Sequence, residues 1–239
     1  MARCVRCNDY KFVNYVLSPG EEPPSGYSFL NLGGENVIPG LPCPACASGF
    51  MYERLRKEAA LPASFAGARL ENVQREQQNQ DIYGLLNSLF KYTRRAPLPR
   101  HIIVLVHGNF GCGKTHALAV AVNEALERGY SAAFVTMAEL LDHLRSGYDD
   151  PKLDYADRYR LWQKVDVLAI DELDRFAPTE WAAEKVFGLL NSRYEAPCLT
   201  LLATNRDASE VDGYLTARIG EHVYNMTGRN MRRLSQLSL

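Results

Sequence analysis

The chain has 239 residues, of which 46% are hydrophobic and 23% charged, an ordinary globular balance that excludes global disorder. This length fits one medium-sized core with a small additional module. The net charge of -1 excludes a protein that coats nucleic acid with a broad basic surface, although a local patch is compatible with it. Basic residues outnumber acidic ones within residues 52–100, and the balance is reversed within residues 101–205.

The N-terminal region contains two close pairs of cysteines, Cys4 with Cys7 and Cys43 with Cys46. The first residues form no apolar signal peptide, and no run of about 18 apolar residues predicts a membrane span, so we expect a cytoplasmic protein with no membrane partner. In that compartment such pairs are metal ligands more often than disulfides, which are the alternative. Four thiolates suit a closed, tetrahedral Zn²⁺ site. Residues 1–57 are therefore expected to form a small zinc-ribbon-like Cys4 domain, although the gap between the pairs exceeds the roughly 15–20 residues of a compact ribbon.

The next part of the chain, residues 58–100, is expected to be a linker and a helical entry segment. A helix is predicted from residue 50 to about residue 57, where Leu61-Pro62 interrupts the pattern. A second helix is predicted within residues 72–95, where apolar residues recur at helical spacing in a polar, Gln-rich run.

From residue 101 onward, short apolar runs alternate with helical patterns. We predict strands at 102–106, 132–135, 165–170 and 199–203, and helices at 115–128, 138–145 and 179–194. The strands are apolar on both faces, which is typical of a parallel sheet covered by helices. The predicted fold class is therefore α/β, a phosphate-loop NTPase fold over residues 101–239, with the order of the strands left open.

A glycine-rich loop separates the first strand from the helix that follows it. Residues 108–115 match G-x-x-x-x-G-K-[ST] and lie between a strand and a helix, as that motif requires. The loop N–H groups and the helix N-terminus would bind phosphate oxygens, Lys114 would reach the β- and γ-phosphates, and Thr115 would ligate Mg²⁺. The expected nucleotide-binding residues are Gly108, Asn109, Phe110, Gly111, Cys112, Gly113, Lys114, Thr115 and His116.

Two further strands end in polar residues that suit nucleotide hydrolysis. Asp171 and Glu172 follow a buried strand, so Asp171 is expected to hold Mg²⁺ and Glu172 to orient or deprotonate the attacking water. Asn205 ends the strand at 199–203 and is expected to contact the γ-phosphate or the water, because parallel strands end on one edge of the sheet. The chain has no Asn-Lys-x-Asp motif for guanine, which favours ATP over GTP.

These residues together resemble a known protein family. The loop with His116, the acidic pair, residues 179–195 with Asn191-Ser-Arg-Tyr-Glu195, and Ala203-Thr-Asn205 resemble AAA+ ATPases of the DnaC/DnaI helicase-loader and IstB transposition-ATPase group. The resemblance covers about residues 61–235, and residues 61–72 are similar to the segment that enters the ATPase core in these proteins. It implies an AAA+ fold and ATP hydrolysis. The C-terminal lid is expected to be shorter than is usual in the family, because the sequence ends at Leu239.

The resemblance also implies roles for two arginines. Arg218 is similar in position to the arginine finger that reaches a neighbouring subunit's ATP, and Arg232 lies in a segment that resembles the second sensor. Arg229 or Arg233 is an alternative for the second role, and a solvated surface arginine is the alternative for both. The permanently charged, forked guanidinium suits phosphate oxygens.

Two other features are interpreted with the help of the family. The N-terminal cysteine module resembles the zinc-binding domains with which some helicase loaders engage the helicase. Interleaved aromatic and basic residues within 145–164 suit single-stranded DNA, although the acidic residues among them and the helical spacing also suit core packing. The aromatic residues of this stretch are Tyr148, Tyr155, Tyr159 and Trp162.

The sequence therefore predicts an ATPase that uses ATP, Mg²⁺ and Zn²⁺ to load a hexameric replicative helicase onto single-stranded DNA, as a homo-oligomer or on the helicase itself. An IstB-like transposition helper that acts on duplex DNA with a transposase is the alternative. A non-catalytic adaptor, in which nucleotide only switches conformation, is a third hypothesis that the acidic pair argues against.

Overall fold

The computed structural model describes residues 12–16, 30–32, 35–42, 55–90, 98–149, 155–175 and 179–231. Its contacts divide the chain into two compact units, Met1–Leu55 and Arg56–Leu239. The described part of the first unit is a three-stranded antiparallel sheet of β1 (Phe12–Val16), β2 (Leu30–Leu32) and β3 (Glu35–Pro42), in the order β1-β3-β2. The pairing of β1 with β3 begins with Phe12 opposite Pro42.

The second unit is built on a parallel sheet of five strands in the order β5-β6-β7-β4-β8. The strands are β4 (Ile102–His107), β5 (Ala132–Thr136), β6 (Val167–Asp171), β7 (Leu199–Thr204) and β8 (Val223–Asn225). The strand β7 therefore lies between β4 and β6, although it follows both of them in the chain. This order brings the carboxyl ends of β4, β7 and β6 side by side.

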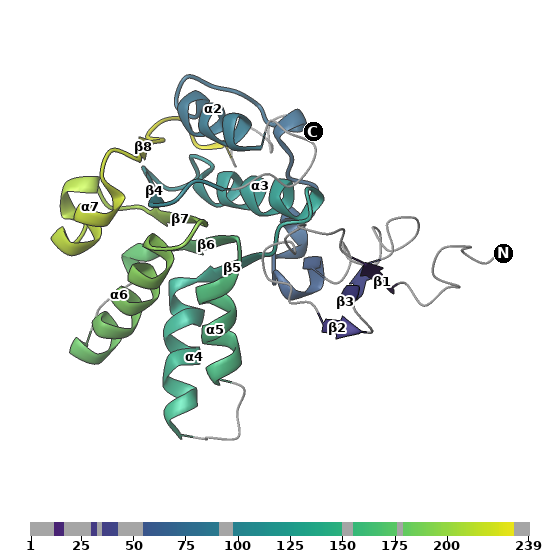
Figure 1. The fold of residues 1–239 in the computed structure, drawn as a ribbon. Helices are drawn as coiled ribbons and strands as arrows, with labels where there is room; N and C mark the ends of the chain where they lie inside the picture. The colour runs from purple at the N-terminus through teal and green to yellow at the C-terminus, as the bar shows by residue number, and fades with distance from the viewer. Residues whose placement is uncertain are drawn as a thin grey trace. The chain divides into compact units, whose positions relative to one another are not determined.

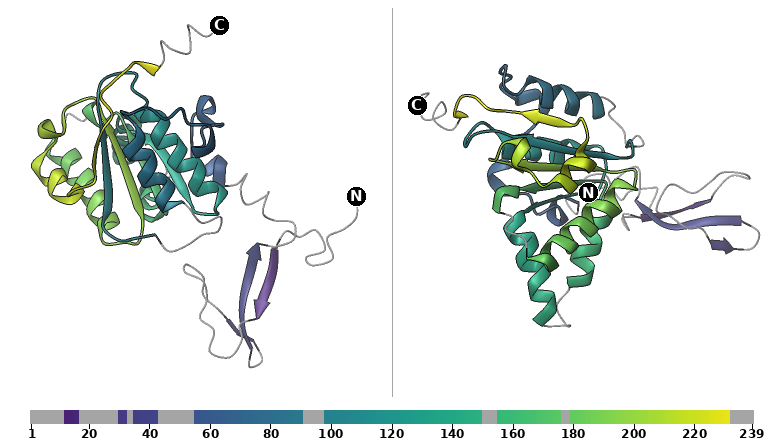
Figure 2. Two further views of the ribbon diagram at one scale, coloured as in Figure 1. Left: turned by 90° about the horizontal axis from the view of Figure 1, so that it is seen from above. Right: turned by 90° about the vertical axis from the view of Figure 1, so that its left-hand side faces the viewer.

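Helices cover both faces of this sheet, as Figures 1 and 2 show. On one face lies α3 (Lys114–Glu127), with α2 (Gln80–Leu89) packed outside it. On the other face lie α4 (Met137–Asp149), α5 (Tyr155–Lys164), α6 (Glu180–Tyr194) and α7 (Gly213–Ile219). Alternate residues of β4 such as Ile103 and Leu105 join the core under α4–α7, and every residue of β6 and β7 is buried. Burial on both faces explains why these strands are continuous apolar runs.

The predicted strands and helices of residues 101–204 are confirmed, with boundaries that differ by a few residues. The helix predicted within residues 72–95 is confirmed as α2, although the pattern did not fix its start at Gln80. The Asn79 side chain accepts a hydrogen bond from Glu76 N and donates one to Gln74 O, so local side-chain bonds replace helical ones before that point. Sequence patterns also did not predict β8, which has three residues and is only partly buried.

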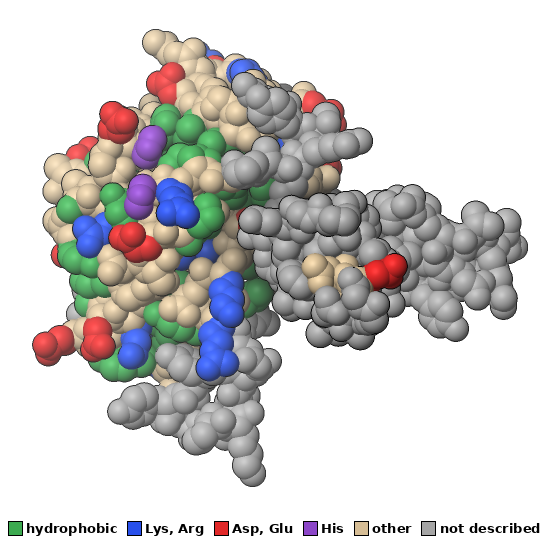
Figure 3. All heavy atoms as spheres, in the orientation of Figure 1, with side chains coloured by type: hydrophobic (Ala, Val, Ile, Leu, Met, Phe, Trp, Pro, Cys, Tyr) green, Lys and Arg blue, Asp and Glu red, His purple; other side chains and the backbone are tan. Residues whose placement is uncertain are grey.

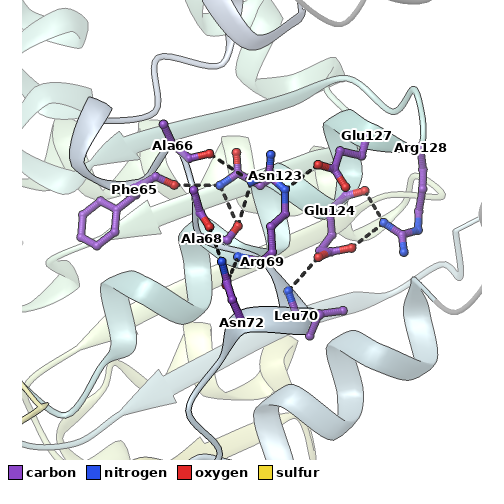
Figure 4. Close-up of polar contacts among 11 residues, drawn as sticks. Phe65, Ala66, Ala68, Arg69, Leu70, Asn72, Asn123, Glu124, Glu127 and Arg128 are labelled. Carbon is purple, nitrogen blue, oxygen red and sulfur yellow. Dashed lines mark hydrogen bonds and ion pairs between the residues drawn. The ribbon is translucent and has the colours of Figure 1, made fainter.

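The entry segment (residues 61–72) contains two short 3-10 helices, η1 (Ala63–Phe65) and η2 (Leu70–Asn72), and is fastened to α3 (Figure 4). The buried Asn123 side chain donates to the carbonyls of Phe65 and Ala68 at 2.9 and 3.0 Å. The next residue, Glu124, accepts from Leu70 N, and one turn further along α3 Glu127 pairs with Arg69. Each such bond stabilises by about 1 kcal/mol, so together they hold the entry segment to the helix that begins at the phosphate loop.

A buried arginine joins three elements on the opposite face of the sheet. Arg193 is 1% exposed, and its guanidinium donates to the carbonyls of Trp162, Val165 and Leu199 and to the Thr200 hydroxyl at 2.7–2.8 Å. Burial lowers its pKa to about 10, yet it stays charged at neutral pH. Arg193 therefore has a structural role, as a link between α6, the end of α5 and the start of β7.

Candidate active site

The phosphate loop connects β4 to α3 and contains three glycines with positive φ: Gly108 (149°), Gly111 (78°) and Gly113 (101°). Close approach of another segment is a second reason for two of them. A Cβ at Gly108 would lie 2.8 Å from the backbone nitrogen of Thr227, and one at Gly111 would lie 2.3 Å from the Asn230 side chain. Side chains at these positions would therefore both strain the turn and displace the C-terminal part of the unit.

Lys114 is 7% exposed and lies against the inside of this loop. Its ammonium donates to the carbonyls of Gly108 and Asn109 at 2.8 and 2.9 Å and contacts Sγ of the buried Cys112. The neighbouring Thr115 donates to Asp171 Oδ2 at 2.7 Å. The hydroxyl and the carboxylate converge on one point and are the hard oxygen ligands that Mg²⁺ takes, so these residues fit the metal.

The acidic pair ends β6. Asp171 is 6% exposed and accepts a bond from Glu172 N at 2.8 Å, whereas the Glu172 side chain is exposed. Glu172 has a φ of 55°, a left-handed conformation that costs a non-glycine residue about 1 kcal/mol or more. The surrounding structure thus holds the carboxylate that we expect to orient water in a strained turn.

Asn205 follows β7, between the phosphate loop and the acidic pair. Its backbone N and its Nδ2 both donate to Asp174 Oδ1, each at 3.0 Å. Asp174 lies in η3 (Leu173–Arg175), directly after the acidic pair. The strand order therefore brings together the three groups expected from the sequence: Lys114 and Thr115, Asp171 and Glu172, and Asn205.

All of these residues line one cleft of about 600 Å³, a size that suits a nucleotide. The cleft is also lined by residues that the sequence analysis did not single out as site residues: Phe65, Asn72, Val73, Gln74, Asn79, Tyr83 and Met231. Most of them belong to the entry segment or its continuation. Their only signal in the sequence was the family resemblance, which covers about residues 61–235.

His116 connects the entry segment to the cleft. Its Nδ1 lies 2.9 Å from the Tyr83 hydroxyl, and its ring meets those of Phe65 and Tyr83 edge to face at 6.4 and 6.5 Å. Burial lowers the pKa of His116 and raises that of Tyr83, because it disfavours the charged form of each. Both side chains are therefore neutral at physiological pH.

A strap of residues 226–231 crosses the phosphate loop and joins it to Gln78. Met226 N donates to His107 O, and Met231 N donates to Gly111 O. Between them the strap backbone pairs with two side-chain amides: Gly228 exchanges hydrogen bonds with Asn109, and Arg229 exchanges them with Gln78. The loop is thus held by segments that are distant from it in sequence.

The arginines expected from the family lie apart from these groups. Arg218, on α7, does not line the cleft; it donates to Asn191 Oδ1 at 3.1 Å and stacks on the rings of Tyr194 and Tyr214. Arg229 is exposed. Arg232 and Arg233 lie outside the described residues.

The remaining aromatic residues considered in the sequence analysis lie in different environments. Phe110, at the tip of the loop, is 72% exposed. In the aromatic stretch considered for DNA, Trp162 is buried against His143, and the half-buried Tyr159 donates to Lys185 O. These two residues therefore belong to the core, whereas the side chains of Tyr148 and Tyr155 lie outside the described part. On the face drawn in Figure 3, acidic and basic side chains are scattered among small hydrophobic patches.

Cys4, Cys7, Cys43 and Cys46, the expected zinc ligands, also lie outside the described residues. Among the residues that are described, no three His, Cys, Asp or Glu side chains are grouped to hold a metal ion. None of the described helices has the length and apolar character needed to cross a bilayer.

Comparison with known proteins finds relatives of this chain. The chain is 27% identical over 135 residues to the replicative helicase loader DnaI of Bacillus subtilis (strain 168), which covers 56% of this chain and 43% of DnaI. It is 35% identical over 109 residues to an ATP-binding protein of insertion sequence IS5376 from Geobacillus stearothermophilus, covering 45% of this chain and 41% of that protein. The chain thus spans less than half the length of these two relatives.

The fold is that of solved AAA+ proteins. The structure of the replication initiator DnaA bound to AMPPCP and single-stranded DNA superposes with a TM-score of 0.63 at 20% identity, over 75% of this chain and 57% of that one. Residues 53–217 match the family described as IstB-like ATP binding protein. Because this match covers well over half of the chain, the protein belongs to that family of ATP-binding AAA+ ATPases.

Proposed function

We propose that this protein uses ATP to load a replicative DNA helicase onto single-stranded DNA. The observation that carries the proposal is the convergence of Lys114, Thr115, Asp171, Glu172 and Asn205 in one cleft, in a chain that is similar to a helicase loader. The first unit, Met1–Leu55, is compact by its own contacts and would contact the helicase.

Within the cleft each residue has a distinct role in hydrolysis. The loop amides and Lys114 would bind the phosphates, and Thr115 and Asp171 would hold Mg²⁺, which supplies positive charge to the phosphate oxygens. Glu172 would orient and deprotonate the attacking water, while Asn205 would contact that water or the γ-phosphate. The entry segment residues Phe65 and Val73 would cover the rest of the nucleotide.

Arg218 would complete a different active site. It lies outside its own cleft, so we infer that its guanidinium contacts nucleotide on a neighbouring protomer, in a homo-oligomer or an oligomer assembled on the helicase. To do so it would leave Asn191 and the two tyrosine rings. Arg232, or one of Arg229 and Arg233, would contact the nucleotide as the second sensor.

A bound zinc ion would stabilise the first unit. Cys7 precedes β1 by a few residues and Cys43 follows β3 directly, and the two strands pair with Phe12 opposite Pro42. In the sequence, one cysteine pair thus precedes the start of β1 and the other follows the end of β3, and this order suits a single Cys4 site. We expect the protein in the cytoplasm, where its helicase and DNA partners are.

The test combines ATP turnover with helicase binding. Turnover should rise with single-stranded DNA, and Lys114→Ala and Glu172→Gln should each lower it by about 100-fold or more. Glu172→Gln should still bind ATP. A stable complex with a hexameric replicative helicase should survive Lys114→Ala and be lost in Cys43→Ser. Absence of a complex with any replicative helicase tested would overturn the loader proposal, and ATP binding without turnover would favour the adaptor.

The second candidate is a transposition helper that acts on duplex DNA. It is favoured by the 35% identity to an insertion-sequence ATP-binding protein. ATP-dependent filaments on duplex DNA in electron micrographs, together with binding to a transposase, would support it over the loader.

A further inference from the structure

Asp174 lies where the two catalytic strands meet. It follows Glu172 by two residues, in η3, and its Oδ1 accepts from both the backbone N and Nδ2 of Asn205 at 3.0 Å. Its own carbonyl accepts from Arg206 Nη2 at 3.3 Å. Asp174, just after β6, therefore contacts both the backbone and the side chain of the residue that follows β7.

The chemistry of the pair determines how the Asn205 amide is turned. An ionised carboxylate only accepts hydrogen bonds, whereas an amide has a donating and an accepting end. Asp174 therefore holds the NH₂ end of Asn205, which leaves Oδ1 and the second N–H of Nδ2 for other partners. Because Asn205 lines the cleft, its amide presents one defined end to the nucleotide rather than two interchangeable ones.

We propose that Asp174 is a positioning residue for ATP hydrolysis, which acts by fixing the orientation of the Asn205 amide. The inference rests on the proposed role of Asn205 in the reaction. It also links the catalytic groups mechanically, since Asp171, Glu172 and Asp174 belong to one short segment. A movement of the acidic pair is transmitted to Asn205 through this carboxylate.

The experiment measures kcat and KM for ATP, with Mg²⁺ and saturating single-stranded DNA, in five variants. These are Asp174→Asn, Asp174→Ala, Asn205→Ala, the double variant Asp174→Ala/Asn205→Ala and Asp207→Asn. Asp207 is the matched control, because it lies two residues after Asn205 but its carboxylate accepts hydrogen bonds from Ser209 and not from Asn205. Melting temperatures and ATP affinity are measured on the same samples, and the milder Asp174→Asn keeps the test valid if Asp174→Ala does not fold.

Asp174→Asn and Asp174→Ala should lower kcat by about tenfold or more, since small errors of orientation are costly, with KM for ATP unchanged. In Asp174→Asn the new amide could pair with either end of the Asn205 amide, so the orientation would no longer be fixed. The double variant should be no slower than Asn205→Ala, because Asp174 acts through that residue. Asp207→Asn should match the wild type.

Wild-type kcat in both Asp174 variants would overturn the inference. So would a double variant whose kcat falls by the product of the two losses seen in Asp174→Ala and Asn205→Ala. If Asn205→Ala itself retains wild-type kcat, Asn205 has no role in the reaction and the inference falls with it. The ATPase assignment would still stand in that case, on loss of turnover in Lys114→Ala.

Discussion

The Thr115 hydroxyl donates a 2.7 Å hydrogen bond to Asp171 Oδ2, which joins the first turn of α3 to the end of β6. These residues lie 56 positions apart. Thr115 follows β4 through the phosphate loop and Asp171 ends β6, and β7 separates these two strands. The contact places the two oxygen groups expected to ligate Mg²⁺ at one point. It also gives the buried Asp171 carboxylate a donor, which lowers the cost of burying its charge.

Thr115→Val should abolish Mg²⁺-dependent ATP turnover, because it removes the hydroxyl while keeping the shape of the side chain. It should also destabilise the protein by about 1–3 kcal/mol, since Asp171 loses a donor. Thr115→Ser is the control and should retain most activity. Turnover is titrated with Mg²⁺ for each variant, and equal Mg²⁺ dependence of the Thr115→Val variant and the wild-type protein would contradict this role.

Gly228→Ala should weaken ATP binding by displacing the strap. A Cβ at this position would lie 1.7 Å from Gln78 Oε1, so either the strap or the Gln78 side chain must move. The movement would withdraw Met231 from the cleft and loosen the Asn109 pair. Nucleotide affinity and melting temperature are measured together.

A second substitution checks that explanation. Gln78→Ala removes the colliding amide, so Gly228→Ala/Gln78→Ala should bind ATP better than Gly228→Ala alone. Gly84→Ala is a control that should raise stability where Gly228→Ala lowers it. A Cβ at Gly84 meets nothing within 4 Å, and alanine in helix α2 should stabilise the protein by roughly 0.5–1 kcal/mol. No rescue by Gln78→Ala would mean that collision with the Gln78 amide is not the cause of the weaker ATP binding.

Acidification should destabilise the protein through His116. Burial lowers the pKa of His116 in the folded state below its ordinary value of 6.5, so the unfolded chain binds the proton first as pH falls. The stability that depends on neutral His116 is thus complete above pH 6.5 and is lost as pH falls through the folded-state pKa. Melting temperature between pH 7.5 and pH 5 should decline less steeply in His116→Gln than in wild type. His222→Gln, away from the cleft, should keep the wild-type slope; equal slopes in all three proteins would exclude this contribution.

Arg193→Met should lower the free energy of unfolding by about 3 kcal/mol, because it leaves three buried carbonyls and the Thr200 hydroxyl without their donor. Arg193→Lys should recover only part of this loss, since one ammonium cannot match the planar fork. Chemical denaturation measures the change, with the exposed Arg145→Met as control. A loss below 1 kcal/mol would show that the link is dispensable.

Much of the ATPase unit was predictable because its signals are local. The glycines and Lys114-Thr115 lie within eight residues, and each strand is a continuous apolar run. The beginning of α2 was not predictable from helical spacing, because the side-chain bonds of Asn79 compete with the helix. Trp162 had two interpretations, and only its burial against His143 resolved them.

The sequence by itself determined the α/β class, the phosphate loop, the acidic pair and the candidate Asn205, because each depends on residues that are adjacent in the chain. The tertiary structure decided which of these meet. Insertion of β7 between β4 and β6 brings Asn205 beside Asp174. The fastening of residues 61–72 to α3 places Phe65 at the cleft, the packing of α2 on α3 places Tyr83 there, and α7 keeps Arg218 away from it. Such contacts follow from strand order and long-range packing, which no local pattern of residues encodes.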